Sequence, residues 1–168
     1  MLIKQLSRKE LNEAIQLVNK CFPYQSWLER TSLPASLFQD NLTCKIKFLF
    51  AKVTQLNYWV GIDEKSQKVI GTTGLYSYKK DEAEAYWLPM FCVDPAFRGQ
   101  GIGKKLLNFS IDKARADGKK FLRLYTSNDP NEAAAQILYE KSGFVITGEE
   151  KVEGTPYKKI YRELRLAD

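Results

Sequence analysis

The chain is 168 residues long, a length typical of one domain with a sizeable hydrophobic core. Lys and Arg outnumber Asp and Glu by 26 to 20, so the formal charge is +6, and histidine is absent. The missing histidine excludes Ser-His and Cys-His nucleophiles and histidine-ligated metal sites, and we expect no metal. No apolar run is long enough to span a membrane, and no signal-like segment opens the chain. We therefore expect a cytoplasmic protein that does not bind membranes.

Two further features of the composition agree with this expectation. The three cysteines, Cys21, Cys44 and Cys92, are odd in number and lack paired spacing, which predicts reduced thiols. The basic residues are dispersed rather than gathered in a run, so nucleic acid is not the expected partner. A basic nucleic-acid-binding domain remains a minor alternative.

The N-terminal third predicts one strand and two helices. Residues 1–6 are typical of a short strand. Ser7 and Glu10 have the spacing of a capping box, and apolar residues at helical spacing follow, which predicts a helix over 8–20. Pro34 is a favourable start for a second, short helix. Residues 42–53 fit either a helix or a strand.

The middle of the chain predicts three strands, at residues 58–62, 68–78 and 85–93. The first two are joined by a short polar turn and form a hairpin. We expect Gly71 and Gly74 to break the second strand, because glycine weakens a strand interior. Pro89 lies inside the third strand and cannot donate to a ladder, so it marks a bulge or an edge there.

The C-terminal half alternates between the two kinds of element. It predicts a helix that ends at Gly118, a strand at 121–126, a helix at 132–142 and an antiparallel pair at 144–150 and 158–166. Strands in runs are followed by strand–helix–strand order, which is typical of an α+β or α/β domain around one central sheet. We expect a single domain over residues 1–168.

A glycine cluster lies between the third strand and the helix that follows it. It reads Arg98-Gly99-Gln100-Gly101-Ile102-Gly103-Lys104. Backbone N–H groups at a helix N-terminus bind phosphate well, and flanking Arg and Lys add positive charge. A tight turn that simply needs glycine is the structural alternative. The spacing matches neither a Walker loop nor a dinucleotide-binding fingerprint.

Two motifs resemble those of a known family, the GNAT N-acetyltransferases. Their pyrophosphate loop reads Arg/Gln-x-x-Gly-x-Gly/Ala after a strand and a Val-x-Pro turn, and here Val93-Asp94-Pro95 precedes the cluster. Their second signature is a helix that ends in Leu-Tyr-Glu-Lys-x-Gly-Phe, which matches residues 138–144. Both motifs occur in order and are separated by one strand. The resemblance is close over about residues 57–150.

The resemblance implies a fold and an activity. The fold would be a mixed, mostly antiparallel sheet of about six to seven strands, with helices on both faces and a splayed strand pair at the CoA site. The activity would be transfer of the acetyl group of acetyl-CoA to a primary amine of a small molecule or peptide, by direct attack in a ternary complex. Dimers are common among such relatives, so a homodimer is possible. A catalytically weak CoA-binding regulatory module is the main alternative.

The resemblance also implies the residues of the site. Those that would bind CoA are Phe91, Cys92, Val93, Arg98, Gly99, Gln100, Gly101, Ile102, Gly103, Lys104 and Asn131. The loop amides would hold the pyrophosphate, and the strand amides would line the pantetheine and polarise the thioester carbonyl. Tyr139 would be the general acid that protonates the departing CoA thiolate.

The chain departs from the family pattern at two positions. Trp87 stands where relatives often carry a Glu that acts as general base. Glu84, just upstream, is the candidate base, with Glu82 and Asp81 as alternatives, unless the amine arrives neutral and needs none. Glu132 stands where relatives often carry Asn, which leaves Asn131 or Asn128 as the asparagine that contacts CoA.

The predicted strands 68–78 and 85–93 carry several aromatic residues where the loop between them begins and ends. This aromatic stretch consists of Tyr76, Tyr78, Tyr86 and Trp87. These side chains either shape the acceptor pocket or belong to the core, and the sequence favours neither.

Overall fold

The computed structural model describes residues 1–23 and 25–166. The strands are β1 (Leu2–Gln5), β2 (Val53–Ile62), β3 (Val69–Tyr78), β4 (Ala85–Trp87), β5 (Cys92–Val93), β6 (Phe121–Ser127), β7 (Val145–Lys151) and β8 (Lys158–Arg165). The helices are α1 (Leu11–Cys21), α2 (Trp27–Arg30), α3 (Ser32–Leu37), α4 (Leu42–Ala51), α5 (Ile102–Ala116) and α6 (Ala133–Lys141). None of the helices in this described part is both long and apolar enough to cross a membrane.

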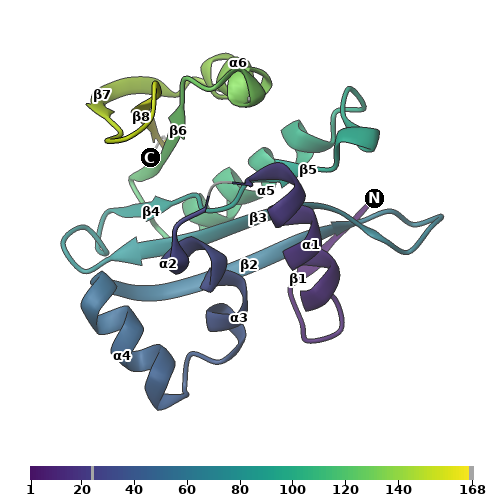
Figure 1. The fold of residues 1–168 in the computed structure, drawn as a ribbon, viewed down its shortest axis with the longest axis horizontal. Helices are drawn as coiled ribbons and strands as arrows, with labels where there is room; N and C mark the ends of the chain where they lie inside the picture. Colours follow the sequence, from purple (N-terminus) through teal and green to yellow (C-terminus); the bar gives the residue numbers. More distant parts are fainter. Residues whose placement is uncertain (24, 167–168) are drawn as a thin grey trace.

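All eight strands form one sheet of order β1-β2-β3-β4-β6-β8-β7, in which β5 pairs with β3 beside β4. Every pairing is antiparallel except β4 with β6. Figure 1 shows β6, β7, β8 and α6 gathered on one side of the long β2–β3 ribbon. The predicted fold class, a mixed and mostly antiparallel sheet with helices, is therefore confirmed. The strand count exceeds the expected six to seven because the predicted strand 85–93 is split into β4 and β5.

Helices cover both faces of this sheet. On one face Tyr58 and Val60 of β2 pack with α1 and α3 in one apolar cluster. On the other face α5 lies against β3, where the Thr73 and Ser110 hydroxyls meet at 2.6 Å. Successive side chains of a strand point to opposite faces, so the long strands β2 and β3 contribute to both cores.

The two glycines of β3 were expected to break the strand, and that prediction is wrong. β3 runs without interruption through Gly71 and Gly74. A Cβ on Gly71 would lie 2.6 Å from Cδ1 of Leu106, and one on Gly74 would lie 2.7 Å from the Tyr58 ring. The glycines are needed because a helix and a ring approach the backbone closely.

The helix-start prediction at Ser7 is also wrong. α1 begins at Leu11, and residues before it form a turn in which the Ser7 hydroxyl donates to Glu10 at 2.6 Å. A complete capping box occurs instead at Ser26, which caps α2 together with Glu29. Residues 42–51 form the helix α4, begun by Asn41, whose side chain accepts from the Thr43 N–H.

Candidate functional site

The strand that precedes the glycine loop changes partner along its length. β4 pairs in parallel with β6, and the last link is the Leu88 N–H, which donates to the Arg123 carbonyl at 2.8 Å. β5 then pairs only with β3 among the described strands, while β6 continues to Ser127 with β8 alone at its side. The edge of β5 that faces β6 is therefore unpaired. Such an edge can accept an extended ligand as if it were another strand.

The change of partner is caused by a kink at Pro89 and Met90. Pro89 has no N–H with which to continue the ladder. Met90 has φ 42, a left-handed conformation that is unfavourable for a residue with a side chain. The Thr72 hydroxyl donates to the Met90 carbonyl at 2.6 Å and holds the kink in place. The sequence predicted a bulge or edge at Pro89, and the structure shows this kink there.

The glycine loop ends in an open helix N-terminus. Gly99 and Gly101 have φ 78 and φ 74, and a Cβ on either would meet no atom within 4 Å. The first intrahelical hydrogen bond runs from the Lys105 N–H to the Gly101 carbonyl at 3.1 Å, so the N–H groups of Ile102, Gly103 and Lys104 have no acceptor within the helix. An open cradle of N–H groups fits a pyrophosphate.

The charged and polar side chains of the loop, Arg98, Gln100 and Lys104, are all exposed, and one of them also bonds to β5. The Arg98 Nε donates to the Val93 carbonyl at 3.2 Å, which ties the loop to β5. Gly103 packs inward, where its Cβ would lie 3.4 Å from Leu138 of α6. The loop thus contacts both β5 and α6.

A cysteine that the sequence did not single out lies against the same strand. The Cys21 sulfur at the end of α1 is 3.8 Å from the Val93 carbonyl oxygen and 4.0 Å from the Arg98 guanidinium. A hydrogen bond with Cys92 lowers the pKa of the Cys21 thiol to about 7, burial opposes this, and Arg98 lowers the pKa further. Cys92 itself is buried beside the Thr72 hydroxyl, at 3.2 Å. No sequence motif marks this pair.

Tyr139 is buried next to the kinked strand. Its ring packs on Phe91 at 5.8 Å and on Phe144 at 5.5 Å between centroids. The hydroxyl has no hydrogen-bond partner among the described residues. Burial, followed by the negative charge of Glu132, raises the pKa of Tyr139 far above its ordinary value. Tyr139 therefore stays protonated at neutral pH.

Glu84 is not brought to the other predicted residues. It precedes β4, whereas Phe91–Val93 follow it, so they lie at opposite ends of this strand. Its carboxylate pairs with the Arg123 guanidinium at 2.9 Å, next to Asp81 at 2.8 Å and Glu163 at 2.6 Å. Partial burial lowers the pKa of Arg123, but hydrogen bonds to the three carboxylates raise it above its ordinary value.

The two candidate asparagines differ in what they contact. The Asn128 side-chain oxygen accepts from the Lys158 N–H at 2.6 Å, which leaves it fixed to β8. Asn131 is exposed in the turn before α6, and its backbone N–H donates to Asp129 at 2.8 Å. Glu132 binds the Thr126 hydroxyl and the Ser127 hydroxyl and N–H. Both asparagines are exposed, and Asn131 is the one whose side chain makes no hydrogen bond among the described residues.

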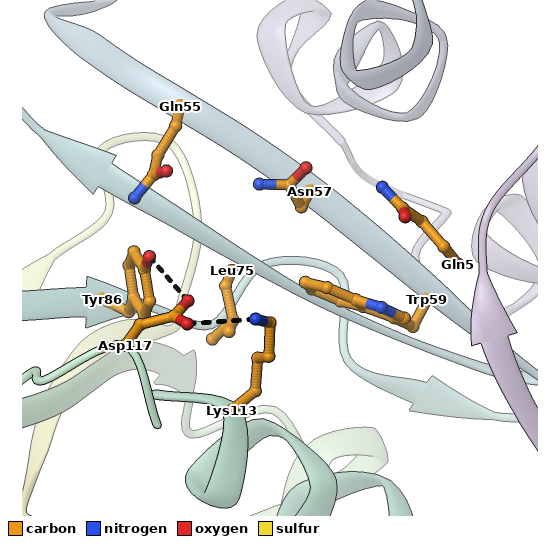
Figure 2. Close-up of a pocket in the computed structure, with 8 residues that line it drawn as sticks. All are labelled: Gln5, Gln55, Asn57, Trp59, Leu75, Tyr86, Lys113 and Asp117. Carbon is orange, nitrogen blue, oxygen red and sulfur yellow. Dashed lines mark hydrogen bonds and ion pairs between the residues drawn. The ribbon is translucent and has the colours of Figure 1, made fainter. Parts of the chain in front are cut away.

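The aromatic stretch is divided between the two faces of the sheet. Tyr78 and Trp87 pack edge to face at 5.4 Å, and Tyr76 lies beside both. Tyr86 points to the other face, where its hydroxyl donates to Asp117 at 3.0 Å. Figure 2 shows Tyr86 and Asp117 in the wall of a polar hollow of about 220 Å³ on the α5 side. Apart from Tyr86, this hollow contains none of the residues predicted for the site, and none of those predicted to bind CoA or to act in catalysis.

The comparisons with known proteins agree on one family. A sequence profile described as the Acetyltransferase (GNAT) family matches residues 11–144. The N-alpha-acetyltransferase RimI of Mycobacterium tuberculosis is 34% identical over 92 residues, which are 55% of this chain and 54% of that protein. The spermine/spermidine N(1)-acetyltransferase of Bacillus subtilis is 37% identical over 78 residues, which are 46% of this chain and 49% of that protein. The chain thus spans about half the length of the curated relatives that it matches.

Solved structures share the fold at low sequence identity. A GNAT-family protein from Desulfovibrio desulfuricans has a TM-score of 0.75 at 16% identity, with 99% of each chain covered. An acetyltransferase from Salmonella typhimurium, solved with acetyl-CoA, has a TM-score of 0.69 at 19% identity, with 100% of this chain and 95% of that one covered.

Proposed function

The chain belongs to the GNAT family of acetyltransferases, and we propose that it is an N-acetyltransferase that moves the acetyl group of acetyl-CoA to a primary amine of a small molecule or peptide. Both reactants bind together and the amine attacks directly, so that no covalent enzyme intermediate forms. Approximation of bound reactants supplies much of the acceleration in a transfer of this kind. The observation that carries the proposal is the unpaired edge of β5 beside the open N-terminus of α5.

The residues present fit acetyl-CoA, which supplies an activated acetyl group as a thioester. The free N–H groups from Gly101 to Lys104 suit the pyrophosphate, and the exposed Lys104 adds positive charge. Backbone groups of Phe91–Val93 suit the pantetheine and the thioester carbonyl, toward which an N–H group can donate. We include Arg98, Gly99, Gln100 and Asn131 as neighbours of the same ligand.

Tyr139 is the proposed proton donor. As the new N–C bond forms and the C–S bond breaks, the Tyr139 hydroxyl gives its proton to the departing sulfur. Its raised pKa keeps that proton in place until then. The attacking amine enters uncharged and loses its proton to water, because Glu84 is held by Arg123 at the other end of β4.

Thermal unfolding tests the donor site. Acetyl-CoA should raise the Tm of the parent protein, since a ligand that binds only the folded state stabilises it. Gly101→Glu should abolish this rise, because a carboxylate would occupy the cradle. Gly118→Glu is the matched control: Gly118 also has a left-handed φ of 72 and open space, but lies at the opposite end of α5. No rise in the parent protein would refute the proposal.

Release of free CoA with a panel of amines tests the reaction. Turnover with at least one primary amine, lost in Gly101→Glu and kept in Gly118→Glu, supports the transferase. A rise in Tm without turnover on any amine would identify a CoA-binding regulatory module instead.

A further inference from the structure

An aromatic wall runs along the sheet face beneath α2. It consists of Tyr76, Tyr78, Trp87, Tyr125 and Tyr161, all half-buried. The register places these side chains in neighbouring rows: Trp87 lies between Tyr76 and Arg123, and Tyr125 lies opposite Tyr161. The Tyr125 hydroxyl donates at 2.7 Å to Glu29 of α2, which places α2 beside the wall.

One end of the aromatic wall carries excess negative charge. Arg123 is surrounded by the carboxylates of Asp81, Glu84 and Glu163, so three negative charges face one positive charge. The Asp81 side chain is only 7% exposed; its Oδ2 accepts from the Trp87 indole N–H at 2.9 Å and from Arg123, and its Oδ1 has no hydrogen-bond partner among the described residues. A buried carboxylate oxygen without a partner is unfavourable unless positive charge is nearby. This local excess stands out in a chain whose formal charge is +6.

Ammonium groups of the chain itself already lie on the rings. The Lys159 Nζ is 4.5 Å from the Tyr125 ring centroid and 5.9 Å from that of Tyr161. The Lys80 Nζ is 5.7 Å from the Tyr78 centroid. Ring faces attract cations within about 6 Å, so these faces are suited to ammonium groups.

The spacing between the two ends of the wall fits an extended chain. Phe91, at the proposed thioester site, follows Trp87 by four residues, and Trp87 is in register with Arg123. Four residues of strand span at most about 13 Å. This is the length scale of an alkyl chain that carries an amine at each end.

From these observations we propose that the acidic end of the wall binds the distal cationic group of an extended diamine or polyamine acceptor, while its other, primary amine reaches Phe91–Val93. The inference rests on the proposed N-acetyltransferase function and names its acceptor class. The carboxylates of Asp81, Glu84 and Glu163 hold the distal charge, and the aromatic faces line the alkyl chain between the two ends.

Paired substrates of equal length test the inference. CoA release is measured with α,ω-diamines from propane to decane and with the alkyl monoamine of each length. We expect kcat/KM for the longer diamines to exceed that of their monoamines roughly tenfold or more, because a hydrogen-bonded charge contact has that effect. The preference should weaken as salt is added, since salt screens charge pairs near the surface.

Glu163→Gln tests whether this carboxylate binds the distal cationic group of the acceptor. It removes one of three charges and leaves Arg123 paired with Asp81 and Glu84, so the fold should persist. The diamine preference should fall to about threefold or less, through KM rather than kcat. Glu149→Gln is the matched control: Glu149 is on the neighbouring strand β7 and pairs with Lys158 instead. It should leave the preference unchanged.

The possible outcomes separate the inference from the function on which it rests. Equal kcat/KM for diamines and monoamines, or a preference untouched by Glu163→Gln, overturns the inference and leaves the transferase standing. If acetyl-CoA neither raises the Tm nor supports turnover with any amine, both are overturned.

Discussion

Tyr139 is the residue whose proposed chemistry depends most on its surroundings. Its ring is enclosed by Phe91 and Phe144, and its hydroxyl has no hydrogen-bond partner in the described part of the chain. Burial raises the pKa of the phenol, which favours the protonated form that a general acid needs. A buried hydroxyl without a partner among the described residues, at the edge of the proposed donor site, supports the proposed role of Tyr139 as proton donor.

Tyr139→Phe should therefore lower kcat roughly a hundredfold, the effect of losing one general acid. The Tm and the rise in Tm with acetyl-CoA should change little, because the hydroxyl makes no contact that folding or CoA binding requires. Steady-state CoA release and thermal unfolding measure the two effects. Unchanged kcat in the variant would remove Tyr139 as the acid.

How far the sequence predicts a residue depends on where its partners lie. Glu84 was a plausible base from its position near the strand, but Arg123, thirty-nine positions away, holds its carboxylate. The contact of Cys21 with Val93 links residues 72 positions apart. Contacts of this range follow from the packing of α1 and β6 on the strand, and a single sequence contains no local signal for them.

At the scale of the element, the kinked strand and the loop after it were the most predictable parts. Proline restricts the backbone and glycine frees it locally. The kink could therefore be predicted from Pro89, and the helix start from the glycine cluster. The prediction that Gly71 and Gly74 break the strand was wrong because glycine also allows another element to approach the backbone closely. Here the approaching elements are α5 and the Tyr58 ring, which are not neighbours in the chain. Residues 42–53 were ambiguous because the spacing of their apolar residues suits a helix while their β-branched and aromatic content allows a strand.

Gly71→Ala tests the close approach of α5 to β3. The new methyl group would lie 2.6 Å from Leu106 Cδ1 and 3.1 Å from the Cys92 carbonyl oxygen, so the helix or β5 must move. We expect a loss of about 1–3 kcal/mol in the free energy of unfolding, measured with urea.

Gly148→Ala provides the comparison. It also lies in a strand, but its methyl group would have its nearest contact at 3.9 Å. This change should alter stability by less than about 0.5 kcal/mol. Equal stability of the two variants would show that α5 does not pack on Gly71 as described.

At the scale of the whole molecule, the sheet has a narrow seam. Strands β1–β5 and strands β6–β8 are joined by the three residue pairs of β4 with β6, and past them β5 and β6 separate. α5 packs on β3 and also touches β6, so it covers the seam from one face. The proposed donor site lies where the sheet is least continuous, so a ligand bound along β5 would contact both halves and add to the β4–β6 pairs that already join them.

Hydrogen exchange with and without acetyl-CoA tests this coupling. A ligand seated along β5 should slow exchange in three places: the N–H groups of Phe91–Val93, the first turn of α5, and the second half of β6, where only β8 supplies partners. Amides of β1 and β2 should not change, because these strands pair with each other and with β3, away from the seam. Exchange reports local opening more sensitively than Tm does. Slowing confined to the hollow of Figure 2, around Trp59 and Lys113, would place the donor in that hollow, away from β5, and refute the seam as its site.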